Sequence, residues 1–270
     1  MARLTDFFRR REPKTEPRLI EEIPITTNAD RRASQVQQRL LTQIPIIDGW
    51  DHHLSYLPCD AVGGDFVDVS PMDDGRILLT IGDVSGHGTQ GALIAVSARK
   101  TIRALVGQAA TLGELVVSLN EDLRSDLLPG QFITAFFALL DPSDGRLVYC
   151  SAGHHMALII DPAGPTHVRR LAGKGMALGI ASSDRMGEHL TLRETNIAVG
   201  ASLVIYTDGI SETRNPNSDE EFSEEQVLAQ LIGNSRLPLA QQVETLVTAA
   251  QAHHGGELED DATVLAIRRR

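Results

Sequence analysis

Four aspartates stand at points where an apolar run of the sequence meets a loop, and carboxylates in such positions are candidates for binding a metal ion. These residues are Asp65, Asp83, Asp208 and Asp260. Carboxylate oxygens are the ligands that hard divalent cations such as Mg²⁺ and Mn²⁺ prefer. A single aspartate at a strand end is ordinary, but four in one chain favour a shared metal cluster.

The first two aspartates are expected to lie opposite each other across a β-hairpin. Apolar residues at 66–69 and 77–81 flank a turn that contains Asp-Gly, a strong hairpin signal. Antiparallel pairing then places Asp65 across from Asp83 with their Cβ atoms roughly 5 Å apart, where like charges repel. A cation between them would remove this repulsion. The alternative, from the hairpin alone, is that both aspartates face water as ordinary strand-end residues.

Further hairpins and consecutive pairs of helices must hold these residues in place. Strands are expected at 50–57, at 132–140 paired with 146–151, at 201–206 and after Asp260, and helices are expected at 92–106, from Thr111, at 223–233 and at 239–252.

Residues 86–91 spell Gly-x-Gly-x-x-Gly between a predicted strand and a predicted helix, which is also the local pattern of a dinucleotide-binding site. That fold requires a second parallel strand within about 30 residues. Instead, a capping box at Thr111 and Glu114 opens a second helix directly after the first. A dinucleotide-binding protein is therefore only a remote alternative.

Three adjacent histidine pairs invite the interpretation of a zinc site. They are His52-His53, His154-His155 and His253-His254. Neighbouring side chains on a strand point to opposite faces, so neither of the two pairs expected near strands can bind one ion through both rings. We therefore do not expect these histidine pairs to bind a metal ion.

The composition is that of a globular protein of 270 residues, long enough for one main domain. The formal net charge of −11 argues against a nucleic-acid partner, because phosphate contacts need a basic face.

The longest apolar run, 132–140, is too short to cross a membrane, and we expect no secretion signal. The two cysteines, Cys59 and Cys150, are far apart in the sequence and match no CxxC pattern, which indicates free thiols in a reducing cytoplasm.

The chain is expected to have three parts. Residues 1–28 mix charges with prolines and predict a mobile N-terminal leader. Residues 29–43 predict a linker or regulatory helix, and residues 44–270 the main domain. The helix carries a narrow apolar stripe at Ala29, Ala33, Val36 and Leu40. This stripe could form a homodimer, but packing on the same domain is the favoured alternative because the helix has few turns.

Five motifs resemble, in order, those of the SpoIIE/RsbU-type serine phosphatases, a bacterial branch of the metal-dependent type 2C (PPM) protein phosphatases. The motifs are Val62-Gly63-Gly64-Asp65-Phe66, Ile81-Gly82-Asp83-Val84-Ser85-Gly86-His87-Gly88, Ala152-Gly153-His154, Tyr206-Thr207-Asp208-Gly209 and Asp260-Asp261-Ala262-Thr263. The resemblance runs from about Ile44 to the C-terminus. It implies a four-layer α-β-β-α sandwich with two antiparallel sheets, which agrees with the hairpins and helix pairs.

The resemblance also implies the ligands of two Mn²⁺ or Mg²⁺ ions. By the family pattern, Asp65 and Asp83 bind the ions, Asp83 bridges both, and the backbone carbonyl of Val84 is a further ligand. Asp208 and Asp260 complete the two sites. Asp261 is expected to support the ligands without binding, although the sequence does not separate it from Asp260.

The function implied is a serine/threonine protein phosphatase that uses a metal-activated water. Its expected substrate is a phosphorylated signalling protein, a STAS-type anti-anti-sigma factor in a partner-switching pathway. Two positions depart from the family: Asp60 stands where relatives often carry Arg, and Val67 replaces a common Tyr. Relatives usually carry a sensor domain, so control is expected through the 29–43 helix, dimerisation or a separate protein. A catalytically silent partner-binding module of the same fold is the alternative.

Overall fold

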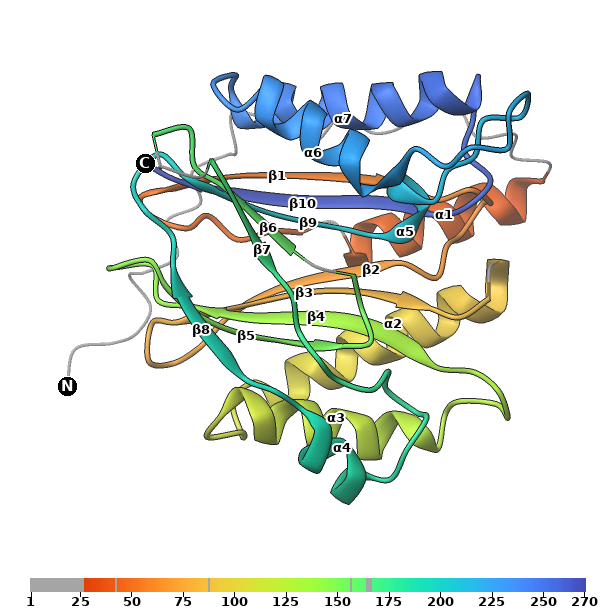
Figure 1. The fold of residues 1–270 in the computed structure, drawn as a ribbon. Helices are drawn as coiled ribbons and strands as arrows, with labels where there is room; N and C mark the ends of the chain where they lie inside the picture. Colours follow the sequence, from red (N-terminus) through yellow and green to blue (C-terminus); the bar gives the residue numbers. More distant parts are fainter. Residues whose placement is uncertain (1–26, 42, 87, 156, 164–166) are drawn as a thin grey trace.

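The computed structural model describes residues 27–41, 43–86, 88–155, 157–163 and 167–270, so the predicted leader lies almost entirely outside the described residues. Two antiparallel five-stranded sheets lie face to face (Figure 1). The first sheet has the order β1 (Trp50–Leu57), β10 (Ala262–Arg269), β9 (Ser202–Tyr206), β6 (Ala157–Ile160) and β7 (Val168–Leu171). The second has the order β2 (Phe66–Pro71), β3 (Ile77–Val84), β4 (Ile133–Leu140), β5 (Arg146–Ala152) and β8 (Arg193–Asn196).

Helices cover the outer face of each sheet (Figure 1). The first sheet is covered by α6 (Ser223–Gly233) and α7 (Leu239–His254), and the second by α2 (Gly88–Leu105) and α3 (Leu112–Arg124), with α4 (Ser183–His189) beside α3. The short helix α5 (Asp208–Ser211) follows β9 directly. The predicted α+β sandwich of four layers is confirmed.

Alternating side chains of the central strands explain why the layers stack. In β10, Leu265 and Ile267 belong to the core between the two sheets, whereas Val264 and Ala266 belong to the core under α6 and α7. Successive residues of a strand face opposite sides of its sheet. Because both faces of this strand are covered, it contains an almost continuous apolar run.

The dinucleotide-binding alternative is contradicted by the strand pairing. Strand β3 pairs antiparallel with both of its neighbours, β2 and β4. Helix α2 is followed by a second helix, α3, whose first turn is capped as predicted: Thr111 Oγ1 accepts a hydrogen bond from Glu114 N at 3.1 Å. The parallel strand that a dinucleotide fold requires after α2 is therefore replaced by a helix.

Helix α1 (Asn28–Leu41) contacts the domain through a different stripe from the predicted one. Its buried residues are Ser34, Gln37 and Leu41. The predicted stripe is exposed at Ala29, Ala33 and Val36, with Leu40 half-buried. The expectation that this stripe packs on its own domain is wrong. The buried face instead carries Leu41 and Gln37, whose side chain bonds to the backbone of Gly63, a contact that an apolar pattern does not reveal.

No helix within the described ranges combines the length and the apolar character that a membrane span needs.

A buried ion pair joins the first hairpin to the helix that covers it. Asp68 of β2 is fully buried, and its Oδ1 lies 3.1 Å from Nε of Arg99 and 2.6 Å from Nε of Arg103, both on α2. Arg99 is also buried and donates to the carbonyl of Val67 at 3.1 Å. Removing one partner of such a pair leaves uncompensated charge in the interior.

Asp68→Ala should therefore lower the free energy of unfolding by about 3–5 kcal/mol. The matched control is Asp74→Ala, in the same hairpin, whose carboxylate pairs with Arg76 at 2.6 Å but lies at the surface. A surface pair contributes at most about 1 kcal/mol. Urea unfolding measures both variants, and equal losses would contradict the different roles of the two pairs.

Candidate metal centre

The hairpin places Asp65 and Asp83 across from each other, as predicted. In the β2–β3 ladder, Phe66 pairs with Gly82, and Val84 N donates to Gly64 O at 3.3 Å. The register between these two pairs sets Asp65 opposite Asp83. The opposed geometry is confirmed.

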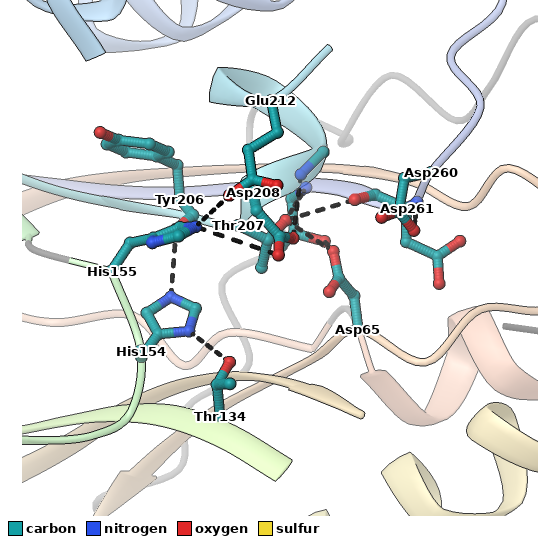
Figure 2. Close-up of polar contacts among 12 residues, drawn as sticks. Asp65, Thr134, His154, His155, Tyr206, Thr207, Asp208, Glu212, Asp260 and Asp261 are labelled. Atoms are coloured by element: carbon teal, nitrogen blue, oxygen red, sulfur yellow. Dashed lines mark hydrogen bonds and ion pairs between the residues drawn. The ribbon is translucent and has the colours of Figure 1, made fainter. Parts of the chain in front are cut away.

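The other carboxylates come from the first sheet and meet the hairpin at one end of the sandwich. Asp208 is the first residue of α5, directly after β9, and Asp260 and Asp261 directly precede β10, which pairs with β9. Figure 2 shows Asp65 beside Asp208, Asp260 and Asp261. Loops from both sheets therefore contribute acidic side chains to the same place.

Asp65 is buried, and one of its oxygens has unused bonding capacity. Oδ2 accepts hydrogen bonds from the hydroxyls of Thr207 at 2.8 Å and Thr263 at 2.6 Å. Oδ1 is buried and has no hydrogen-bond partner in the described part of the chain. Burial, followed by the charges of Asp83 and Asp261, raises the pKa of Asp65 well above its ordinary value despite the two hydroxyl donors. An unpaired buried carboxylate oxygen is costly unless a cation accompanies it.

Repulsion among the carboxylates is also felt at Asp83. Burial raises the pKa of Asp83 to about 7, with further contributions from Asp208, Asp260 and Asp261. Every cause is either burial or negative charge, which is the electrostatic character of a cation site. The donor set, all oxygen, fits Mg²⁺ or Mn²⁺.

Asp261 has a different geometry from Asp260. Its two oxygens accept hydrogen bonds from the backbone N–H groups of Cys59 at 2.8 Å and Gly64 at 2.6 Å. A Cβ on Gly63 would lie 2.5 Å from the same carboxylate, so this approach requires glycine there. Asp261 therefore holds the loop that leads into Asp65, in line with the supporting role implied by the resemblance. Asp260 is exposed, and its Oδ1 accepts from Asp261 N at 2.8 Å.

The Val84 carbonyl lies next to this loop. A Cβ on Gly64 would be 3.0 Å from Val84 O, so the glycine allows the two backbone segments to lie close together. The carbonyl named by the resemblance is thus at the same end of the sandwich as the carboxylates.

His154 connects the two sheets behind the carboxylates. Its Nε2 lies 3.1 Å from the carbonyl oxygen of Tyr206, which can only accept, so Nε2 carries the proton and Nδ1 accepts from the Thr134 hydroxyl at 3.0 Å (Figure 2). Burial, followed by the neighbouring His155, lowers the pKa of His154 to about 3, so the ring is neutral. It fixes the end of β9 two residues before Asp208.

Several residues of this region were not assigned a role from the sequence. Thr207 and Thr263 belong to the recognised motifs but carry no charge that draws attention to them. Gln37 is 26 positions from its partner, and nothing in the spacing of apolar residues predicts its contact. Glu212 follows Asp208 by one helical turn and lies beside His155.

The fold is that of the type 2C (PPM) phosphatase domains. The structure superposes on the SiaA-PP2C domain of Pseudomonas aeruginosa with a TM-score of 0.75 at 23% sequence identity, covering 89% of this chain and 95% of that one. The family model described as Stage II sporulation protein E (SpoIIE) matches residues 73–270. The chain belongs to the SpoIIE family. Asp83, Asp208 and Asp260 lie within the matched region, and Asp65 precedes it.

Two curated relatives match most of this chain. It is 26% identical over 251 residues to the protein IcfG of Synechocystis sp., covering 82% of this chain, and 25% identical over 215 residues to the phosphoserine phosphatase RsbU of Bacillus subtilis, covering 79%. The chain spans 38% of the length of IcfG and 62% of the length of RsbU. The similarity is therefore to a part of each relative.

The contact between α1 and the Asp65 loop predicts a measurable loss of stability. Gln37 is buried, its Nε2 donates to Gly63 O at 2.6 Å, and its Oε1 accepts from Gly63 N at 3.0 Å. Gln37→Leu leaves both backbone groups unpaired, which costs about 1–3 kcal/mol for each buried group. Gln35→Leu, on the exposed side of the same helix, is the control. If chemical denaturation gives the two variants the same midpoint, the contact has no energetic weight.

The raised pKa of Asp83 predicts a pH-dependent stability of the metal-free protein. An ordinary aspartate has a pKa near 3.9, so between about pH 4 and pH 7 the folded chain holds a proton that the unfolded chain releases. The free energy of unfolding therefore falls as the pH rises through this window. In EDTA at about pH 8, Asp83→Asn should be more stable than the wild type by at least about 1 kcal/mol, and the difference should shrink toward pH 4.

The measurement is urea unfolding of both proteins in EDTA at the two pH values. A stability difference that stays constant with pH would show that the Asp83 carboxyl is not held in its protonated form.

Proposed function

We propose that this chain is a metal-dependent protein phosphatase that hydrolyses phosphoserine or phosphothreonine on a signalling protein. The observation that carries the proposal is the meeting of Asp65, Asp83, Asp208 and Asp260 at one end of a SpoIIE-family sandwich, with the Oδ1 of Asp65 buried and unpaired among the described residues. The relatives RsbU and RsbP of Bacillus subtilis are both named phosphoserine phosphatases, which supports the same activity here.

In this proposal, two Mn²⁺ or Mg²⁺ ions are held by Asp65, Asp83, Asp208 and Asp260, with the Val84 carbonyl as a further ligand. When bound, such ions lower the pKa of water, so that hydroxide forms near neutral pH, and they neutralise charge on the phosphoryl oxygens.

The chain's own residues prepare the site. Thr207 and Thr263 hold one oxygen of Asp65 and leave the other without a hydrogen-bond partner in the described part of the chain. Asp261 fixes the preceding loop through two backbone N–H groups. Because Asp83 has a pKa of about 7 in the metal-free chain, cation binding releases its proton, and cation affinity should rise with pH up to this value.

The net reaction transfers the phosphoryl group to water. The water oxygen gives up a proton and forms a bond to phosphorus, the bond to the serine or threonine oxygen breaks, and that oxygen takes up a proton. Because water is the acceptor, the chain needs no nucleophilic side chain, and no covalent enzyme intermediate forms.

We propose a STAS-type anti-anti-sigma factor as the substrate and the cytoplasm as the location. This proposal follows the resemblance to partner-switching phosphatases. A homodimer through residues 29–43 is part of the proposal, and the exposed apolar stripe of α1, with Val36 at 59% exposure, supports it.

A second candidate is a silent partner-binding module of the same fold. Asp60, which stands where relatives often carry Arg, favours it, because an exposed carboxylate there repels a phosphate group. The complete acidic set favours the enzyme instead, since a module that only binds a partner has no need to bury the Oδ1 of Asp65 without a hydrogen-bond partner among the described residues.

Phosphate release from a phosphorylated STAS protein tests the choice. We expect turnover with Mn²⁺ or Mg²⁺, none in EDTA, and a fall in kcat of at least about 100-fold in Asp83→Asn, equal to about 2.7 kcal/mol. Asp74→Asn, at the exposed hairpin tip, is the control and should keep full activity. Turnover that is indifferent to chelator and to Asp83→Asn would overturn the proposal, and partner binding without turnover at saturating Mn²⁺ would favour the silent module.

A further inference from the structure

A buried tyrosine hydroxyl lies at the same end of the sandwich as the carboxylates and has no part in the mechanism described above. Tyr56, on β1, is 7% exposed, and its hydroxyl oxygen is buried with no hydrogen-bond partner within the described ranges. The Oδ1 of Asp65 is likewise buried and unpaired there. Buried polar groups are normally hydrogen-bonded, and an unsatisfied one destabilises the fold. Two such atoms near each other point to a partner that they share.

The strand pairing brings Tyr56 close to Asp65. In the β1–β10 ladder, Tyr56 pairs with Thr263, and Leu54 pairs with Leu265 two residues further along. Paired side chains lie on the same face of a sheet with Cβ atoms about 4.5–5.5 Å apart. Tyr56, Leu54 and Leu265 all belong to the core between the two sheets, and on this face Thr263 Oγ1 donates to Asp65 Oδ2 at 2.6 Å. Tyr56 therefore lies beside the threonine that already holds Asp65.

The hydroxyl keeps its proton and can donate it to an acceptor. Burial, followed by the charges of Asp261 and Asp65, raises the pKa of Tyr56 well above its ordinary value. Both oxygens of Asp261 already accept from backbone N–H groups, whereas the Oδ1 of Asp65 accepts from none of the residues that the structure describes. The Oδ1 of Asp65 is therefore the nearby carboxylate oxygen that still lacks a donor.

A bridging molecule is needed because the two unpaired oxygen atoms are not within hydrogen-bond distance of each other. A water that accepts from the phenol and donates to the carboxylate joins two oxygen atoms about 5–5.5 Å apart, which is twice the usual O–H···O length. A carboxylate oxygen has two lone pairs, so the Oδ1 of Asp65 can accept from this water and also bind a cation.

We propose that Tyr56 is a positioning residue of the metal centre, and that its hydroxyl binds one buried water that donates to the Oδ1 of Asp65. Groups that orient a metal ligand in this way typically change metal affinity by about 10–100-fold when they are removed. The inference rests on the proposed function, because it assigns Tyr56 to the same cation centre, but it concerns binding of the cation and not turnover.

The first test is the Mn²⁺ affinity of the full chain, measured by electron paramagnetic resonance of the free ion. Tyr56→Phe removes the hydroxyl and keeps the ring, and we expect the Kd for Mn²⁺ to rise about 10-fold. Tyr149→Phe is the matched control, because Tyr149 is a buried tyrosine of the same core on β5, stacked on Phe136, and should leave the Kd unchanged.

An unchanged Kd in Tyr56→Phe would overturn the inference and leave the phosphatase proposal intact. A wild-type chain that binds no Mn²⁺ would overturn both, so the two failures are distinguishable.

The second test is urea unfolding in EDTA, where the sign of the change is informative. Removing a hydroxyl that is buried without any partner would leave the stability unchanged or raise it, whereas removing one that holds a water lowers it. We therefore expect a lower urea midpoint for Tyr56→Phe than for the wild type. We also expect a high-resolution crystal structure of the wild type to show the water between Tyr56 and Asp65. An equal or higher midpoint, or a crystal structure without this water, would contradict the assignment.

Discussion

Repulsion between carboxylates gathered at one end of the sandwich is the constraint on which the rest of the site depends. Asp65 and Asp83 face each other from one sheet, and Asp208 and Asp260 approach from the other. Left without a counter-charge, this crowding raises the pKa values of Asp65 and Asp83 and destabilises the ionised fold. The hydrogen bonds to Asp65 come from two hydroxyl groups, and those to Asp261 come from two backbone N–H groups. These donors are neutral, so they do not cancel the negative charge. A divalent cation bound there would supply the missing positive charge.

The sandwich explains how residues distant in sequence reach one place. Antiparallel strands return the chain to the same end repeatedly, so the start of β2 and the end of β3 are neighbours, as are the end of β9 and the start of β10. The two sheets then bring these ends together, and His154 joins them through Tyr206 and Thr134. The four aspartates thus lie at or next to strand ends.

The parts of the fold and of the site that depend on local chemistry could be predicted from the sequence. The Asp-Gly turn fixed the register that opposes Asp65 and Asp83, and the capping box at Thr111 located α3. The short strands β6, β7 and β8 could not be predicted in this way. Each has four residues, which is too short to show a clear periodicity, and their pairing depends on strands that are distant in the sequence. The contact of Gln37 with Gly63 and the approach of His155 to Glu212 are equally products of tertiary packing.

The most direct measurement of the central claim is anomalous scattering at the manganese edge from a crystal of the full chain soaked in Mn²⁺. The account predicts two anomalous peaks bounded by Asp65, Asp83, Asp208 and Asp260, with one of them in contact with the Oδ1 of Asp65 that lacks a hydrogen-bond partner among the described residues. Aspartates that lie together as described but acquire no manganese, or that lie apart, would contradict it.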